Sequence, residues 1–200
     1  MLRIGVAGNS GIYKTSEILY RIYAIKGAGQ EGEAHGLLPE IHMFCFELSD
    51  EIPCLVNDSE FDILIINSHC KGMYDNLTSK YNLPLSKVII INSDEREIMN
   101  YLPNNATQKL ITYGINNKAC VTASSMAEGA CTICIQRAFA SLSGRQLVQQ
   151  EFTINSLKGI RSKEEEARES ELENKTYSLL AAVTCALISD IPIDIIEKLY

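Results

Sequence analysis

The chain has 200 residues, 46% of them hydrophobic, which is enough for one domain with a sizeable core. Its formal net charge is -7 and it has no Lys/Arg-rich run. Nucleic acids and anionic membrane surfaces both require clustered positive charge, so we expect neither as the main partner. No apolar run approaches the roughly 20 residues that span a bilayer. We also see no basic-then-apolar leader, and we expect a cytoplasmic protein.

The first elements form a strand, a glycine loop and a helix. Residues 2–7 are an apolar strand, and "GNSG" follows at 8–11. Apolar residues at helical spacing (Ile18, Leu19, Ile22, Tyr23) predict a helix over residues 15–26, with Thr15 or Ser16 as its N-cap. A glycine-rich loop comes next.

Continuous apolar strands dominate the middle of the chain. The segments "IHMFCFEL", "FDILIINS", "LSKVIIINSDE" and "KLITYGI" lack alternation, which is typical of parallel strands covered on both faces. "REIMNYL" predicts a short helix between the last two. Alternating strands and helices predict an α/β fold with a doubly wound, mostly parallel sheet.

The pattern changes after residue 118. Residues 119–156 contain strand-like runs separated by glycine-bearing turns, which predict a small antiparallel sheet. The mixed-charge stretch "SKEEEARESELE" is expected to be solvated, and a helix with an apolar half at Leu179, Leu180, Val183 and Leu187 follows it. A short helix closes the chain, with Asp190 as its cap and Pro192 near its first turn.

The glycine loop suggests phosphate chemistry. A strand that runs into glycines and then a helix aims backbone N–H groups at a phosphate. A nucleotide loop of this kind carries Lys-Ser/Thr directly after its last glycine, but Gly11 is followed by Ile12 and Tyr13. Lysine and hydroxyl come two positions later, as Lys14 and Thr15. The candidate nucleotide-binding residues are Gly8, Asn9, Ser10, Gly11, Lys14 and Thr15.

The order of these segments resembles the central, ATP-binding domain of the Mur ligase family, which includes the peptidoglycan amino-acid ligases and folylpolyglutamate synthetase. The best-matching stretches are "VIIINSDEREIMNYL", "LITYGINNKACVTASS" and "NKTYSLLAAVTCALISDIPIDIIEKL". The resemblance covers essentially all of residues 1–200. It implies a P-loop sheet of the Mur ligase central-domain type as a single domain, without the amino- and carboxy-terminal ligase domains. It also implies ATP and Mg²⁺ as cofactors.

The sequence departs from the family at several chemical positions. Against the family loop, Ile12 stands where the phosphate lysine belongs and Tyr13 where the Mg²⁺-binding hydroxyl belongs. "FELSD" is similar to the family's acidic strand end, which makes Glu47 the candidate Mg²⁺ ligand or, equally, a strand-end acid in solvent. In "NSHCKGMYD" Asn67 remains, but the family's Asp-His metal site is lost. The family's His-Asn pair beside the adenine reads Asn174-Lys175.

Other motifs have simpler interpretations. "GVAGNSG" also matches the glycine pattern of dinucleotide-binding folds, with Glu47 as the acid. In a strand, Cys131 and Cys134 face opposite sides, so we expect two thiols that pack rather than a redox or zinc pair. The three histidines have no zinc spacing, and His42 is expected to be a core group.

Two classes of function follow. The first is a catalytically degenerate, Mur-ligase-like pseudoenzyme that binds a partner or a nucleotide-like ligand. The second is the ATP-binding subunit of a carboxylate–amine ligase, in which Lys14, Thr15 and Glu47 hold MgATP. Such a subunit requires a ligase partner chain, and a homo-oligomer is the other assembly we consider. The residues leave open whether the chain is an enzyme.

Overall fold

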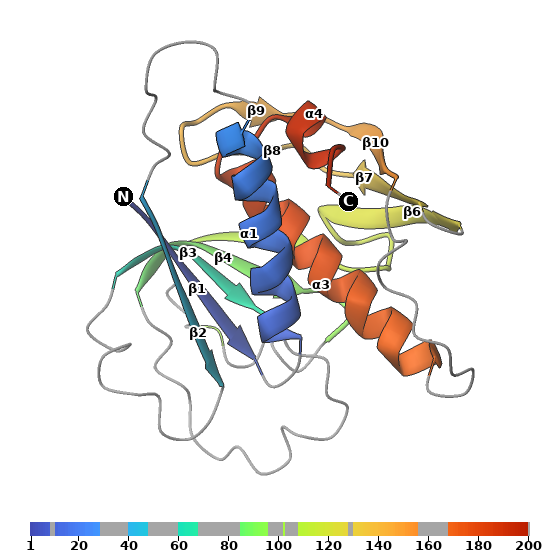
Figure 1. The fold of residues 1–200 in the computed structure, drawn as a ribbon, viewed down its shortest axis with the longest axis horizontal. Helices are drawn as coiled ribbons and strands as arrows, with labels where there is room; N and C mark the ends of the chain where they lie inside the picture. The colour runs from blue at the N-terminus through green and yellow to red at the C-terminus, as the bar shows by residue number, and fades with distance from the viewer. Residues whose placement is uncertain are drawn as a thin grey trace.

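The computed structural model describes residues 1–8, 11–28, 40–47, 60–67, 85–95, 102, 108–127, 130–155 and 168–199. Within these ranges an eight-stranded sheet has the order β10-β7-β6-β5-β4-β3-β1-β2 (Figure 1). Its strands are β1 Leu2–Gly8, β2 Ile41–Glu47, β3 Phe61–Ile66, β4 Ser86–Asn92, β5 Lys109–Tyr113, β6 Val121–Ala127, β7 Ala130–Ile135 and β10 Gln150–Ile154. A separate two-stranded sheet pairs β8 (Phe139–Ala140) with β9 (Gln146–Leu147). The helices are α1 Ile12–Ala28, α3 Arg168–Ile188 and α4 Ile193–Ile196.

The sheet has a parallel and an antiparallel part. Strands β1 to β5 pair in parallel, and β6 joins β5 in parallel through Tyr113 and Val121. Strands β6, β7 and β10 pair antiparallel. The predicted α/β fold with a mostly parallel sheet is therefore confirmed, as are the antiparallel strands. Three of those strands extend the main sheet, and β8 and β9 form the small separate sheet.

The parallel strands are buried on both faces. Helices α1 and α3 cross one face of the sheet (Figure 1), and a large core cluster there includes Ile4, Ile65, Ile90 and Leu180. A second cluster lies on the opposite face and includes Leu64 and Ile89. Burial on both faces explains why these strands read as unbroken apolar runs. None of the helices in the described ranges combines the length and apolarity needed to span a bilayer.

Helix α1 begins three residues earlier than predicted. Gly11 has φ 69°, and its carbonyl accepts the Thr15 N–H at 2.8 Å, which closes the first helical turn directly after the loop. Thr15 and Ser16 therefore lie inside the helix, and their prediction as N-caps was wrong. The Ser16 hydroxyl donates to the Ile12 carbonyl at 2.9 Å. Ile12 is buried in the core cluster, so the apolar spacing starts at Ile12 and continues through Leu19.

Two predictions about strand residues have different outcomes. His42 is exposed, because β2 is the outermost strand of the described sheet, and its prediction as a core group was wrong. Along β7, Cys131 is buried in the core and Cys134 is on the opposite, half-buried side, as expected for packed thiols.

The helix predicted at 96–102 lies outside the described residues except for Leu102. Helix α3 includes the second half of the mixed-charge stretch.

Asp190 does not cap the last helix, contrary to the prediction. Pro192 occupies the N-cap position of α4, which has no side-chain cap bond. Asp190 instead ends α3 in the left-handed region at φ 60°, and Ile191 N–H then reaches back to the Ala186 carbonyl at 3.0 Å. This is a helix C-terminus of the Schellman type, at which glycine or asparagine is usual.

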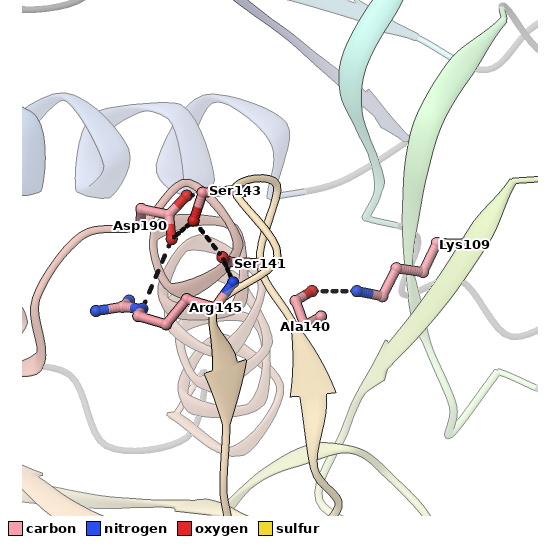
Figure 2. A network of polar contacts seen from close by, with 6 residues as sticks. All are labelled: Lys109, Ala140, Ser141, Ser143, Arg145 and Asp190. Atoms are coloured by element: carbon pink, nitrogen blue, oxygen red, sulfur yellow. Dashed lines mark hydrogen bonds and ion pairs between the residues drawn. The ribbon is translucent and has the colours of Figure 1, made fainter.

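The Asp190 carboxylate ties this helix end to the β8–β9 hairpin (Figure 2). It accepts the Ser143 hydroxyl at 2.8 Å and the Ser143 N–H at 3.1 Å, and Arg145 lies 3.6 Å away. On the other side of the hairpin the Lys109 ammonium donates to the Ala140 carbonyl. The hairpin is therefore held between the end of α3 and the start of β5.

We expect the Asp190 contact to make stability pH-dependent. Burial alone would raise the pKa of Asp190, but hydrogen bonds from Ser141 and Ser143 and the charge of Arg145 hold it below its ordinary value of 3.8. The ionised form therefore stabilises the fold fully above pH 3.8, and this contribution is lost as the pH falls through the lower folded pKa. Asparagine also tolerates the left-handed backbone, so Asp190→Asn mainly removes the charge. It should lower the free energy of unfolding by about 1 kcal/mol at pH 7.

Urea unfolding of both proteins from pH 7 downward measures this contribution. The difference between them should shrink below about pH 4. A difference that stays constant down to pH 2 would show that the charge of Asp190 is not responsible.

Candidate functional site

The strand order reverses at β1. Its two neighbours are β2 and β3, whereas β4 and β5 continue on the β3 side only. In open α/β sheets, ligands bind outside the carboxyl ends of the strands at this topological switch point. Gly8 lies at that end of β1, and Asn67 directly follows β3 beside it. The site predicted from the sequence is therefore at the place where the fold favours ligand binding.

The carboxyl ends of β1 and β3 are in close contact at Gly8. The Asn67 N–H donates to the Ala7 carbonyl at 2.7 Å, which brings the Asn67 backbone against Gly8. A Cβ atom at Gly8 would lie 1.7 Å from the Asn67 carbonyl oxygen. Glycine is required here because nothing larger fits between the two strands.

Asn67 also connects the first turn of α1 to β5. Its amide donates to the Thr15 hydroxyl at 2.6 Å, and its Oδ1 accepts the Tyr113 hydroxyl at 3.2 Å. Thr15 and Asn67 are buried, as is Tyr113. Thr15, a predicted nucleotide-binding residue, therefore uses its hydroxyl as an acceptor for Asn67.

The three residues that follow Gly11 point in different directions. Ile12 packs in the core, and Tyr13 is 74% exposed. The Lys14 ammonium pairs with the Glu17 carboxylate at 2.9 Å on the helix surface. The helix begins directly after Gly11, so Ile12 and Tyr13 are its first two residues.

The remaining predicted site residues are placed only in part. Asn9 and Ser10 lie outside the described residues. Glu47 ends β2 and pairs in register with Gly8, which puts its backbone beside the glycine loop, but its side chain is not described. Within the described residues no group of three or more His, Cys, Asp or Glu side chains could hold a metal ion.

Helix α3 also contacts Gly11. The Ser178 hydroxyl donates to the Gly11 carbonyl at 3.3 Å. A Cβ at Gly11 would lie 2.8 Å from Ser178 Oγ and 2.9 Å from Asn67 Nδ2. Gly11 is therefore enclosed by α3 and β3, in addition to having the left-handed backbone that favours glycine.

Asp94 organises the next strand end. Its carboxylate accepts the Ile115 N–H at 2.6 Å, the Asn116 N–H at 3.3 Å and the Tyr177 hydroxyl at 3.0 Å. The Asn116 side chain also donates to it. Asp94 thereby joins the end of β4, the turn after β5 and helix α3.

The sequence pattern predicted no role for Asp94, Tyr113 or Ser178, and Asn67 was noted only as the residue that remains of the family's lost metal site. All but Ser178 stand at or just after the end of a buried apolar strand, where a polar side chain falls at the carboxyl edge of a parallel sheet. That placement is the signal that could have identified them. Ser178 has no such signal, because its partner Gly11 is 167 positions away.

The first glycine of the dinucleotide-binding pattern, Gly5, is not in a turn in the structure. Gly5 lies inside β1, and a Cβ there would lie 2.9 Å from Leu64 Cδ1. It therefore serves packing between strands, whereas the dinucleotide pattern uses its first glycine for a tight turn.

Comparison with known proteins supports the fold. A search of protein-family models found no match, and a search of curated proteins found none either. Among solved structures, the chain is similar to a UDP-N-acetylmuramoyl-L-alanyl-D-glutamate–2,6-diaminopimelate ligase, with a TM-score of 0.53 and 17% identity. The match covers 100% of this chain and 46% of that ligase. The fold is Mur-ligase-like. The chain spans less than half the length of that enzyme, and at this identity the likeness concerns the fold alone.

Replacing Gly8 should disrupt the site and the fold together. We expect Gly8→Ala to lower the free energy of unfolding by about 3 kcal/mol or more, because β1 and β3 would have to separate. Gly144→Ala is the matched control, since Gly144 has φ 89° but nothing within 4 Å of an added Cβ. It should cost about 1–2 kcal/mol from backbone strain alone. Urea denaturation of the two variants compares them, and equal costs would refute the steric argument.

Proposed function

We propose that this chain is a catalytically degenerate, Mur-ligase-like domain that acts as a binding module, related to the ligases of peptidoglycan or folylpolyglutamate synthesis. The observation that carries the proposal is the position of Ile12. It is the first residue of α1, where the family resemblance places the phosphate lysine, and its side chain is buried in the core. A hydrocarbon there supplies no charge to a phosphate.

The geometry of Lys14 supports the same conclusion. A lysine holds phosphate as a point charge, so its direction matters as much as its distance. Lys14 lies two positions further along the helix, and its ammonium is bonded to Glu17 at 2.9 Å. The hydrogen bond from Lys14 also lowers the pKa of Glu17, so the Glu17 carboxylate is charged at neutral pH. Binding a triphosphate through Lys14 would require this pair to break.

The ATP-binding subunit of an amide ligase is the second candidate. An exposed ion pair such as Lys14–Glu17 contributes about 0–1 kcal/mol, which a triphosphate could replace. The register of Gly8 with Glu47 puts a carboxylate residue beside the loop, where Mg²⁺ would be held. A partner chain would then supply the acceptor and the amino acid. A dinucleotide-binding role is the third candidate, and NAD is its probe.

Calorimetric titration with MgATP, MgADP and NAD separates these candidates. We expect no MgATP binding with a dissociation constant at or below about 10 μM, within the range of ordinary enzyme affinities. Lys14→Ala should leave any weaker binding unchanged within about twofold, as should the control Lys26→Ala on the same helix. A tenfold loss confined to Lys14→Ala would support the ATP-binding subunit.

The purified chain should also show no ATP hydrolysis above a blank. The reason is that this sequence lacks the Asp and His residues of the metal site found in the family it resembles. Phosphate release is measured for the protein and for Glu47→Ala. If Glu47→Ala abolishes the turnover, the proposal that the domain is catalytically degenerate is wrong. If the turnover survives the substitution, the active site lies elsewhere.

A further inference from the structure

Strand β2 ends the described sheet and has the features of an unprotected edge. It pairs with β1 over seven residues without a break in register, and none of the described strands pairs with its other side (Figure 1). Edge strands are usually kept from further pairing by shortness, charged residues, proline or a bulge. Residues 41–46 contain no Asp, Glu, Lys, Arg or Pro. The edge of β2 is therefore suited to pairing with a further strand.

Strand β10, at the other end of the described sheet, differs in these respects. It has five residues, and the side chain of Glu151 is exposed on it. A charged side chain on a short strand makes pairing with another chain less favourable. The two ends of the sheet are therefore not equivalent, and only β2 combines length with a run of uncharged residues.

Helix α1 carries two exposed tyrosines beside the β2 edge. Tyr13 is 74% exposed and Tyr20 is 56% exposed. Their spacing of seven residues puts them on one side of the helix, together with the exposed Ala24. Large aromatic side chains that are this exposed on one helix face are typical of surfaces that bind another protein.

The contacts of α1 fix the direction in which this side of the helix points. The Thr15 hydroxyl contacts Asn67, which follows β3, and the Ser16 hydroxyl lies 2.9 Å from Cys45 Sγ on β2. Successive helical residues are about 100° apart, so the rotation from Thr15 to Ser16 runs across the sheet towards β2. The two tyrosines lie about 40–60° further in the same direction. They therefore face outwards past the β2 edge.

The charges on this side of α1 are of both signs. The Glu17 carboxylate lies between the tyrosines and pairs with Lys14 at 2.9 Å and with Arg21 at 2.6 Å. The whole chain has a formal net charge of -7, which opposes the association of two copies. At this surface, however, an acid and two bases lie together. A two-fold axis can place the acid of one copy against a base of the other.

We propose that two copies of this chain pair through their β2 strands, antiparallel and about a two-fold axis beside Phe44, so that one sheet continues into the other. Strands are about 4.8 Å apart, and α1 lies over β1 and β2. The two α1 helices are then about 10 Å apart on one face of the joined sheet, which is the separation of packed helices. We call β2 and the outward side of α1 (Tyr13, Glu17, Tyr20, Arg21 and Ala24) the edge surface.

The two-fold axis makes the edge surface complementary to itself. The paired α1 helices run antiparallel, and the contact of Ser16 with Cys45 sets their alignment. Tyr13 of one copy comes opposite Ala24 of the other, a large side chain against a small one. Glu17 comes within reach of Arg21 of the other copy. The shapes and the charges of the two surfaces therefore match.

A second copy fits the edge surface better than other occupants do. An extended peptide would pair with β2 but would leave the tyrosines exposed, and a single helix would cover the tyrosines but leave the strand edge unpaired. A second copy supplies a strand and a helix at the required spacing. The inference goes beyond the proposed function, because it does not depend on what the glycine loop binds.

Sedimentation velocity at increasing protein concentration tests the assembly. We expect a dimer at about 100 μM, since protein interfaces range from micromolar to tighter affinity. Tyr20→Glu and Cys45→Lys should each weaken dimerisation about tenfold or more, because one places a charge between the helices and the other adds charge to the strand edge. Both side chains are exposed, so the variants should fold.

Val148→Glu is the matched control. Val148 is also an exposed apolar residue, at 58%, but it lies between β9 and β10, outside the edge surface. This variant should dimerise like the unmodified chain. An equal loss of dimer in Val148→Glu would refute the assignment to the edge surface.

A charge swap tests the alignment of the two copies. Arg21→Glu places acids opposite each other across the axis, and Glu17→Arg places bases there, so each variant alone should be monomeric at about 100 μM. An equal mixture should form a dimer, because every acid then faces a base of the other copy while the charges within each chain still repel. A mixture that stays monomeric would refute the alignment.

Two further outcomes overturn the inference. One is a chain that is monomeric throughout this concentration range, which would leave β2 to another occupant such as a peptide strand. The other is a dimer that Tyr20→Glu and Cys45→Lys both leave unchanged, because its interface would then lie elsewhere.

Discussion

The contact between the carboxyl ends of β1 and β3 is the constraint on which the site depends. Asn67 makes it through its backbone, which donates to Ala7 and leaves no room for a side chain at Gly8. The same residue binds Thr15 and Tyr113 through its side chain. One residue therefore fixes the distance between two strands, the start of α1 and the position of a buried tyrosine.

Much of the fold could be predicted from the sequence because each signal is local. Buried parallel strands read as apolar runs, and the runs behind β1, β3, β4 and β5 are long enough to be unambiguous. The start of α1 was also readable, since Ile12 and Leu19 are seven residues apart on one helical face. It was missed because hydroxyl residues at 15 and 16 resemble caps. In the structure the helix instead starts after Gly11, whose backbone has φ 69°.

Where sequence reasoning failed, the deciding partner is distant in the chain. Asp190 resembles the cap of the helix that follows it, but its carboxylate binds Ser143, 47 positions earlier. His42 lies in an apolar segment, yet its strand is at the edge of the described sheet, a fact of strand order rather than of composition. The Tyr177–Asp94 contact is of the same kind. Local spacing in the sequence carries no information on such pairs. The contacts between residues that are distant in the chain could therefore not be predicted.

The two unusual features of the site have opposite effects on stability. Ile12 is the first residue of α1, and burial of its side chain in the core stabilises the unliganded domain by about 1.5–3 kcal/mol. The Nδ2 donor of Asn92, which has no partner among the described residues, costs a similar amount. Replacing Asn92 with an apolar residue of similar size would remove that cost.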